Sequence, residues 1–339
     1  MMRLPWFSFR APASLGEAAS ILAAEGPQAM LIAGGTDLLP NMKRRHQTPG
    51  TLVSLGRIEA LKKVANGSGT TLGAGLTLNE IVANPAVRDK YAGLWQAAAQ
   101  VATVHLRNMG TLGGNLCLDT RCNYYNQNYE WRKAIDFCMK KDGEICWVAT
   151  ASKRCVATSS TDCAPALISL GASVRLVSAQ GEREVALPDL YRNDGIDYLA
   201  RRPDEILTEV KLPAPEGWRS SYWKLRRRGA FDFPVLGVAA AVRTARDGTV
   251  EEARIALGAV SSRPLLTRAG ELLVGRKLSD DAIAEAGVKV ASAAKPMDNT
   301  DLDLYWRKGV VPEFVGYALR EIRGDDMSSV RLRIARHAL

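Results

Sequence analysis

The sequence predicts an α+β protein of about two domains, and three observations support this. The 339 residues are 47% hydrophobic and 24% charged, which is typical of a globular chain that buries its own core. Before residue 213, short β-prone runs with glycine punctuation alternate with helix-start signals. After residue 217, strand patterns are followed by helical ones, which is the order expected of a small α+β unit.

The Pro- and Gly-containing segment 213–217 has the composition of a linker and is taken as the domain boundary. The expected units are a first domain at 1–213 (subdomains at about 1–55 and 56–213), a C-terminal domain at 218–325 with a three-stranded sheet, and a tail at 326–339.

The first helix is predicted by Ser14 and Glu17, which have the spacing of a capping box. The helix is expected to run to about Ala24, where Gly26-Pro27 follows closely and stops it. The apolar run 29–33 then predicts a short buried strand.

A glycine turn, Gly34-Gly35, follows this strand and precedes a short helix expected at 38–43, capped by Thr36 or Asp37. Glycines let the backbone approach a ligand closely, and a helix start points N–H groups at it. The segment is therefore a candidate phosphate site, although a tight turn without a ligand remains open. It is not a Rossmann fingerprint, because the third glycine is missing and no acid lies about twenty residues further on.

The rest of the first domain is expected to hold a second, mixed sheet with helices. The strand candidates are 52–55, 61–64, 70–75 and 205–212, with a hairpin of 174–178 and 183–187 around Gln180-Gly181; helices are expected from Thr77 and over 94–102. In the second domain the strand candidates are 221–225, 236–242 and 250–257, and the helical ones are 269–274, 280–294 and 312–323.

Four cysteines, Cys122, Cys138, Cys146 and Cys155, lie in one segment of the first domain. Iron–sulfur clusters are usually held by four cysteine thiolates. Zinc accepts four as well, but its structural sites usually carry close C-x₂₋₄-C pairs, which are missing here. Aromatic residues are frequent in the segment and form either a shell around a cluster, an ordinary small core or a partner surface. From spacing alone an iron–sulfur cluster, zinc and unligated cysteines all remain open, and Cys117 and Cys163 are expected to be buried free thiols.

The charge distribution and the remaining sequence patterns argue against several classes of function. The net charge of +9 is scattered over small clusters without a nucleic-acid-binding motif, so no nucleic-acid partner is expected. No apolar run is long enough to span a bilayer and no signal-peptide pattern opens the chain, so a cytoplasmic protein without membrane contact is expected. His46, His105 and His337 form no ligand pattern and are expected to be structural or exposed, and no catalytic residue is identified.

Three motifs together resemble the FAD subunits of the molybdenum hydroxylases, the xanthine-dehydrogenase and carbon-monoxide-dehydrogenase family. They are Leu-Ile-Ala-Gly-Gly-Thr-Asp-Leu at 31–38, Leu-Arg-Asn-Met-Gly-Thr-Leu-Gly-Gly-Asn at 106–115 and Asp-Cys-Ala-Pro-Ala-Leu at 162–167. The resemblance implies a two-subdomain FAD-binding domain followed by a small α+β domain, and Tyr222 to Arg228 with Phe231 to Pro234 resemble a further landmark of the family.

The resemblance also implies which residues hold FAD. The pyrophosphate would be wrapped by the first motif, which consists of Leu31, Ile32, Ala33, Gly34, Gly35, Thr36, Asp37 and Leu38. Thr111, Gly114 and Asn115 would lie along the phosphate and ribityl chain, and Asp162 would bind the ribityl hydroxyls. Ile206 would touch the ring system or adenine, and Lys224 would lie near the isoalloxazine. For Lys224, a surface cation on an exposed strand is the alternative.

The chain departs from most of this family between Asn115 and Asp162, which stand 47 positions apart and leave about forty extra residues. All four cysteines of the central segment fall in this excess, at about 119–158. The departure resembles the FAD and 4Fe–4S subunits of the 4-hydroxybenzoyl-CoA reductases. By that resemblance Cys122, Cys138, Cys146 and Cys155 are the ligands of a 4Fe–4S cluster.

The resemblance implies an electron-transfer subunit of an anaerobic aromatic-degrading enzyme. Reduced ferredoxin would deliver electrons through the 4Fe–4S cluster and FAD to a small partner with 2Fe–2S clusters and a large partner with molybdopterin, in a dimer of heterotrimers. The large partner would convert 4-hydroxybenzoyl-CoA to benzoyl-CoA. The alternatives are a hydroxylase flavin subunit that passes electrons to NAD or oxygen, and a zinc-stapled interaction subunit without catalytic function.

Overall fold

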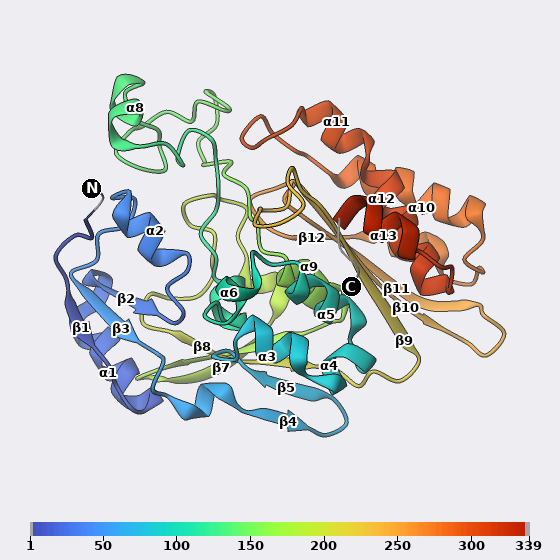
Figure 1. Ribbon diagram of the computed structural model, residues 1–339, viewed down its shortest axis with the longest axis horizontal. Coiled ribbons are helices and arrows are strands. Elements are labelled where there is room, and N and C mark those ends of the chain that lie inside the picture. The colour runs from blue at the N-terminus through green and yellow to red at the C-terminus, as the bar shows by residue number, and fades with distance from the viewer. Residues whose placement is uncertain (1–2, 336–339) are drawn as a thin grey trace.

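The computed structural model describes residues 3–335, in which the strands form three sheets of three, five and four strands. Figure 1 shows the N-terminal sheet at the left, the five-stranded sheet below and the four-stranded sheet at the right. Residues 119–158, here called the insert, form a separate lobe at the top. Helices and sheets occupy distinct regions, which confirms the predicted α+β class.

The N-terminal sheet is parallel, with strand order β1-β3-β2. The run 52–55, expected in the second sheet, is instead the central strand β3 of this one, because Val53 packs with the apolar face of α1. Half of the predicted capping box forms: Ser14 Oγ accepts the Glu17 N–H at 3.2 Å, but Glu17 accepts from Ala13. The elements are β1 (Ser8–Arg10), α1 (Leu15–Glu25), a 3-10 turn at Gly26–Gln28, β2 (Ala29–Ile32), α2 (Leu38–Lys43) and β3 (Thr51–Ser54).

The five-stranded sheet has the order β4-β5-β8-β6-β7, and all its neighbouring strands are antiparallel, so the expected mixed sheet is wrong. The predicted hairpin forms as β6 and β7. The strand expected at 61–64 is also wrong: Leu61 is a buried residue of a 3-10 turn, and the strand begins at Val64. The elements are a 3-10 turn at Glu59–Lys62, β4 (Val64–Asn66), β5 (Thr70–Gly73), β6 (Ser173–Ser178), β7 (Gly181–Ala186), a 3-10 turn at Leu187–Leu190 and β8 (Ile206–Leu212).

Short helices pack against this sheet and share its hydrophobic core, with buried residues such as Leu94, Leu112, Leu167 and Val210. The helix expected from Thr77 begins with a complete capping box, in which Thr77 and Glu80 bind each other's backbone N–H. The helices are α3 (Leu78–Ala83), α4 (Pro85–Lys90), α5 (Ala92–Ala99), α6 (Val104–Arg107), α7 (Leu112–Leu116) and α9 (Cys163–Ser169).

The C-terminal sheet has four strands in the order β12-β11-β10-β9, not three. The extra strand β12 has only three residues, too few to show a period in the sequence. Helix α12 packs against β9 and β10 of this sheet, and α10 packs against α12 within the same hydrophobic core. Most of the segment expected to be a tail forms α13. The elements are β9 (Trp218–Leu225), β10 (Leu236–Thr244), β11 (Val250–Gly258), β12 (Leu265–Thr267), a 3-10 turn at Arg268–Leu273, α10 (Asp280–Ala293), α11 (Leu304–Gly309), α12 (Val311–Arg323) and α13 (Ser328–Ala335).

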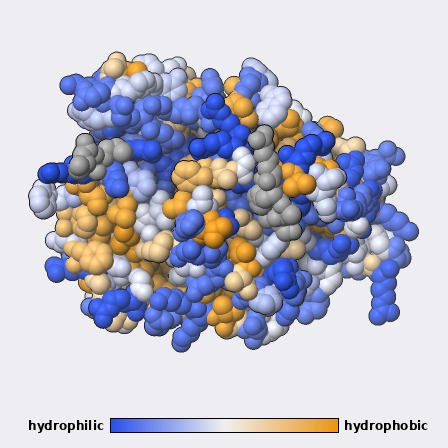
Figure 2. All heavy atoms as spheres, viewed as in Figure 1, coloured by the Kyte–Doolittle hydropathy of each residue, from blue (hydrophilic) through white to orange (hydrophobic). Residues whose placement is uncertain are grey.

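The insert contains one helix in the structure, α8 (Tyr129–Ala134), and otherwise consists of turns and loops. Its two ends are joined by paired backbone hydrogen bonds between Arg121 and Thr158, at 2.7 and 2.8 Å. Asn299 of the C-terminal region braces this stem through its Nδ2, which donates to the Val156 carbonyl at 2.6 Å. The lobe is mostly hydrophilic on the face seen in Figure 2. Within residues 3–335, no helix is long and apolar enough to cross a bilayer.

Candidate cofactor sites

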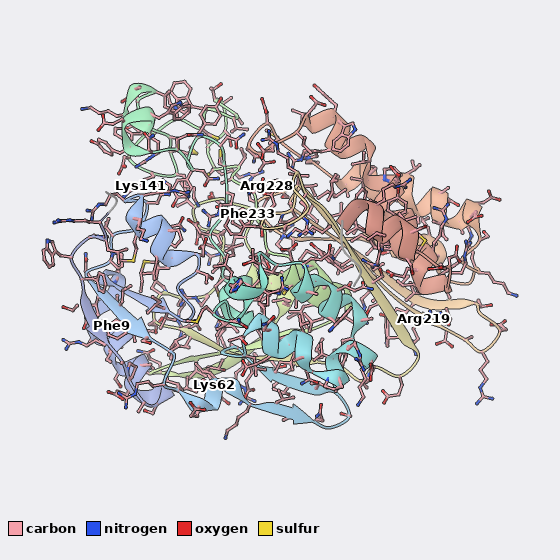
Figure 3. All side chains as sticks on the ribbon, in the orientation of Figure 1. Phe9, Lys62, Lys141, Arg219, Arg228 and Phe233 are labelled. Carbon is pink, nitrogen blue, oxygen red and sulfur yellow. The ribbon has the colours of Figure 1, made fainter. Side chains whose placement is uncertain are left out.

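A cavity, here called the main cavity, opens between the N-terminal sheet, the helices above the five-stranded sheet and the stem of the insert. All the residues expected to hold FAD line it except Ile206 and Lys224. Arg228 and Phe233, labelled in Figure 3, line it from the segment after β9. The residues that line it from the expected set are Leu31, Ile32, Ala33, Gly34, Gly35, Thr36, Asp37, Leu38, Thr111, Gly114, Asn115 and Asp162.

Two backbone segments meet at Gly34 on one side of this cavity. A Cβ added there would lie 1.8 Å from the carbonyl oxygen of Met109, so only glycine lets the two segments touch. The next residue, Gly35, has a φ of +71°, in the left-handed region that favours glycine. The glycine pair therefore fixes how the turn 34–37 approaches the segment that leads into α7.

The expected cap of α2 is not made by a side chain. Asp37 occupies the cap position, but its side chain makes no capping hydrogen bond. Its carboxylate instead forms an ion pair with Arg121 of the insert, and Arg121 also donates to Asn41 Oδ1 at 3.1 Å. The insert is thus tied to the glycine turn by a largely buried arginine.

Other polar groups that line the main cavity, on Asn115 and Ser160, leave capacity for a ligand. The carbonyl Oδ1 of Asn115 accepts from Thr161 Oγ1 at 2.7 Å and from the Cys163 N–H at 3.1 Å, so its amide nitrogen is the group it offers to the cavity. Ser160 Oγ is buried and has no hydrogen-bond partner in the part of the chain that the structure describes. A buried hydroxyl without a hydrogen-bond partner lowers the stability of the folded protein. A polar ligand in the cavity would supply that partner.

Asp162 also lines the main cavity, and its carboxylate is bound by Tyr222 and Lys224. Its carboxylate accepts from Tyr222 Oη at 2.7 Å and from Lys224 Nζ at 2.9 Å, and Lys224 also donates to the Gln100 carbonyl at 3.0 Å. Burial raises the pKa of Asp162 and lowers that of Lys224, so the pair keeps its charges only while the groups stay in contact. Lys224 is fully buried, so the surface-cation alternative is wrong.

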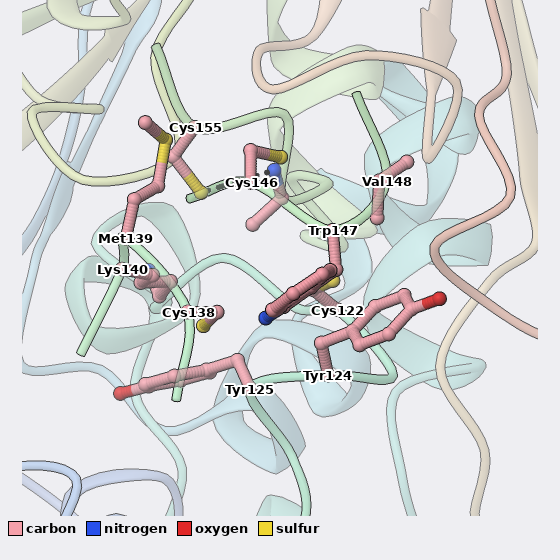
Figure 4. A pocket seen from close by; sticks show the side chains of 11 residues that line it. Cys122, Tyr124, Tyr125, Cys138, Met139, Lys140, Cys146, Trp147, Val148 and Cys155 are labelled. Carbon is pink, nitrogen blue, oxygen red and sulfur yellow. Dashed lines mark hydrogen bonds between the residues drawn. The ribbon is translucent and has the colours of Figure 1, made fainter. Parts of the chain in front are cut away.

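A second, small cavity, here called the cysteine cavity, lies inside the insert. Figure 4 shows Cys122, Cys138, Cys146 and Cys155 around it, with Trp147 and two tyrosines among the aromatic side chains beside them. All four cysteines are buried, with 4–7% of each exposed. The structure therefore brings together the four residues expected to hold a cluster, which lie up to 33 positions apart in the chain.

The thiols of this cavity lie in a dry environment with backbone donors. Burial raises the pKa of Cys122 to about 12 and that of Cys155 to about 11. The Ala157 N–H donates to Cys155 Sγ at 3.4 Å, and the backbone of Tyr124 and Tyr125 does the same for Cys122. Buried thiols of this kind lose their protons when a metal binds. N–H donors to sulfur then help to set the reduction potential of a bound cluster.

The four cysteines of the cysteine cavity do not form a ready-made site for a metal ion. Among the described residues, no group of three or more His, Cys, Asp or Glu side chains is arranged to hold a single metal ion. The other two cysteines lie elsewhere: Cys117 lines the main cavity, and Cys163 is fully buried in the core of the five-stranded sheet.

Comparison with known proteins identifies the architecture. The family model described as the FAD binding domain in molybdopterin dehydrogenase matches residues 5–215, and the model of the CO dehydrogenase flavoprotein C-terminal domain matches residues 220–322. The chain belongs to the FAD-binding subunits of the molybdopterin dehydrogenases. FAD binding and the two-part α+β fold come with this family.

Individual relatives cover most of this FAD-binding subunit. The FAD-binding subunit PaoB of an Escherichia coli (strain K12) aldehyde oxidoreductase is 32% identical, covering 83% of this chain and 89% of that protein. The nicotinate dehydrogenase FAD-subunit of Eubacterium barkeri is 29% identical, covering 80% and 81%. A solved structure of carbon monoxide dehydrogenase from Hydrogenophaga pseudoflava matches with a TM-score of 0.77 and 26% identity, covering 94% and 98%.

Sequence reasoning missed several residues of the main cavity in this subunit. Asp119 and Arg121 enter it from the stem of the insert, and Tyr198 and Arg201 from the loop before β8. Their positions depend on long-range packing, so no local pattern marks them. Leu207, not the expected Ile206, faces the cavity, because alternate residues of β8 point to opposite sides and Ile206 is buried with α1.

His46 lies at the contact between the N-terminal region and the insert. His46 is buried, stacks on Tyr125 at 4.3 Å and lies 3.3 Å through Nε2 from the Gln127 carbonyl, while its Nδ1 has no partner in the described chain. Burial lowers the pKa of His46 to about 4. His105 lies on α6, and His337 lies outside the described residues.

We expect acid to destabilise this contact through His46. In the unfolded chain the imidazole has its ordinary pKa of 6.5, so between pH 6.5 and 4 the unfolded state binds more protons and stability falls as the pH falls. His46→Phe keeps the stacked ring but cannot be protonated. Its melting temperature should drop less than that of the wild type between these pH values, and parallel pH profiles of the two proteins would contradict the assignment.

Proposed function

We propose that this chain is the electron-transfer subunit of a molybdenum-containing complex, with FAD in the main cavity and a 4Fe–4S cluster in the cysteine cavity. The observation that carries the proposal is the gathering of four distant cysteines around one buried cavity, next to the cavity lined by the FAD motifs. Each cysteine of such a cluster binds a different iron, so its ligands need not converge on one point as they do around zinc.

The residues of the main cavity fit FAD. The turn 34–37 would bring backbone N–H groups and the start of α2 to the pyrophosphate. Ser160 and the amide nitrogen of Asn115 would bind the ribityl and phosphate oxygens. Asp162 is held by hydrogen bonds from Tyr222 and Lys224. Lys224 acts through Asp162, so its contribution is to keep that carboxylate charged and oriented.

The residues that line the cysteine cavity include the donor set that an iron–sulfur cluster takes. Cys122, Cys138, Cys146 and Cys155 supply the four thiolates, and the backbone donors to Cys122 and Cys155 oppose the negative charge that collects on sulfur. Aromatic side chains limit access of water. When bound, the two cofactors supply the electron-carrying chemistry, and the chain positions them and sets their electrostatic surroundings.

The specific reaction we propose is reduction of 4-hydroxybenzoyl-CoA to benzoyl-CoA, with water as the second product. Reduced ferredoxin would be the donor, and the substrate would bind on a large molybdopterin partner beside a small 2Fe–2S partner, in a dimer of heterotrimers. The support is the cysteine-bearing insert, together with the family to which the chain belongs. No substrate site is then needed in this chain.

A second candidate is the FAD subunit of an oxidising molybdenum hydroxylase that passes electrons to an acceptor such as NAD or oxygen. The 32% identity to the FAD-binding subunit of an aldehyde oxidoreductase favours it. This candidate shares both cofactor sites but reverses the direction in which electrons cross the chain.

Assays of the intact complex separate the two reactions. Purified under nitrogen, it should form benzoyl-CoA from 4-hydroxybenzoyl-CoA with reduced ferredoxin and should not oxidise aldehydes with NAD, oxygen or a dye. Aldehyde oxidation without benzoyl-CoA formation would replace the first reaction by the second. A complex that contains zinc and no flavin would contradict both and support the interaction-subunit alternative.

A further inference from the structure

A buried ion pair forms part of the wall between the two cavities. Asp119 lines the main cavity and Lys140 lines the cysteine cavity. The Lys140 ammonium lies 2.8 Å from Asp119 Oδ1, and the two side chains are 6% and 5% exposed. Lys140 is therefore the member of the pair that belongs to the cysteine cavity, and Asp119 is the member that belongs to the cavity proposed for FAD.

The ammonium end of this pair is fixed by its hydrogen bonds. Besides Asp119, Lys140 Nζ donates to Thr120 Oγ1 and to the Gly195 carbonyl, both at 2.6 Å, so all its donors are used. The ammonium also lies 4.8 Å from the centre of the Tyr125 ring. Gly195 is itself held by the cysteine region, because its N–H donates to the Cys155 carbonyl at 2.8 Å.

The carboxylate end is fixed as well. Asp119 Oδ2 accepts from Tyr125 Oη at 3.0 Å, and its Oδ1 accepts from Lys140. Two other charged residues that line the main cavity, Asp37 and Arg121, form an ion pair with each other. The Asp119–Lys140 pair consequently has one orientation, and water screens it little because both groups are buried.

A fixed pair of this orientation acts differently on the two cofactors. Reduction adds negative charge, so a nearby ammonium favours the reduced cluster and raises its reduction potential. A nearby carboxylate opposes reduction of the flavin and lowers its potential. The same pair therefore moves the two potentials in opposite directions.

We propose that the Asp119–Lys140 pair is a buried dipole that sets the difference in reduction potential between the cluster and FAD. Both are positioning residues, since they act on the cofactors through the electric field and bind neither. The inference rests on the proposed function, because it needs both cofactors in their cavities. Each member of the pair lines one of the two cavities, and neither is needed as a ligand by the cofactor proposed there.

The test removes both charges at once with the variant D119N/K140M, which keeps the volumes of the side chains and leaves neither charge buried alone. In the intact complex, an anaerobic redox titration follows the cluster by EPR and the flavin by absorbance. At the wild-type midpoint, the ratio of reduced to oxidised cluster should fall about tenfold, equal to about 59 mV for a one-electron couple. The corresponding flavin ratio should rise.

The matched control is R276M/E285Q, which removes an exposed ion pair of 2.7 Å in the C-terminal domain. It should leave both potentials unchanged. If D119N/K140M carries wild-type amounts of iron and FAD but its potentials stay unchanged or move together, the inference is wrong. Absence of the cluster from the wild-type protein would instead contradict the proposed function.

A second variant keeps the test decisive should the double variant not assemble. Asp119→Asn alone leaves the hydrogen bonds of Lys140 to Thr120 and Gly195 in place and removes only the negative end. Both potentials should then rise, because one uncompensated positive charge remains between the sites. A fall of either potential in this variant would contradict the inference.

Discussion

Replacing Cys138 by serine should remove the cluster and leave the flavin. Cys138 lines the cysteine cavity and is 6% exposed, so a bound cluster would lose one of its four thiolates there without access to a substitute ligand from solvent. The preceding residues Asp136 and Phe137 both have positive φ, an uncommon conformation for residues other than glycine, so the chain turns sharply just before this side chain. About four irons per chain and the EPR signal of the cluster should be lost.

Cys117→Ser is the matched control for this experiment. Cys117 is the nearest cysteine in sequence to the insert but lines the main cavity, so this variant should keep its iron. FAD absorbance should persist in Cys138→Ser, because Cys138 does not line the main cavity. Normal iron content in Cys138→Ser, or in the more severe Cys138→Ala, would remove Cys138 from the ligand set.

Replacing Gly34 by alanine should empty the flavin site. The added Cβ would lie 1.8 Å from the Met109 carbonyl oxygen, a backbone atom that cannot move aside without shifting the segment that leads into α7. The turn 34–37 and the residues Thr111 to Asn115 would separate, and the proposed pyrophosphate contacts depend on both. We expect FAD content to fall at least about tenfold, which corresponds to about 1.4 kcal/mol of lost binding free energy.

The same substitution at Gly16 controls for the loss of a glycine, since a Cβ there meets no atom within 4 Å. Gly16→Ala should bind FAD normally. Retained cluster EPR in Gly34→Ala would show that the chain folds and that the loss is local to the main cavity. Full FAD occupancy in Gly34→Ala would mean that the turn does not form the phosphate site.

Local signals predicted most of the elements. Strand β8 alternates, the hairpin β6–β7 has its glycine turn, and Thr77 opens α3 with a complete capping box. The errors came where packing outweighs local preference. The run 52–55 looks the same in either sheet, and only contact with α1 places it in the N-terminal one. Leu61 is an apolar residue of a 3-10 turn, where its side chain is buried, and it does not lie in a strand.

The parts of the two candidate sites that carry a sequence motif were predicted. The glycine turn and the segment 111–115 do line one cavity, and the four cysteines do line another. Lys224 was expected to face the cofactor, but its partner is Asp162, about sixty positions earlier in the chain, and spacing cannot reveal such a pair. Asp119 and Lys140 carried no motif, and only the fold shows that they stand between the two cavities.

The most direct measurement is anomalous diffraction at the iron absorption edge from crystals of the complex grown under nitrogen. The account predicts a compact anomalous peak inside the insert, bonded to the sulfurs of Cys122, Cys138, Cys146 and Cys155, beside FAD density in the main cavity. Free thiols with no anomalous peak, or one zinc ion in place of iron, would contradict it.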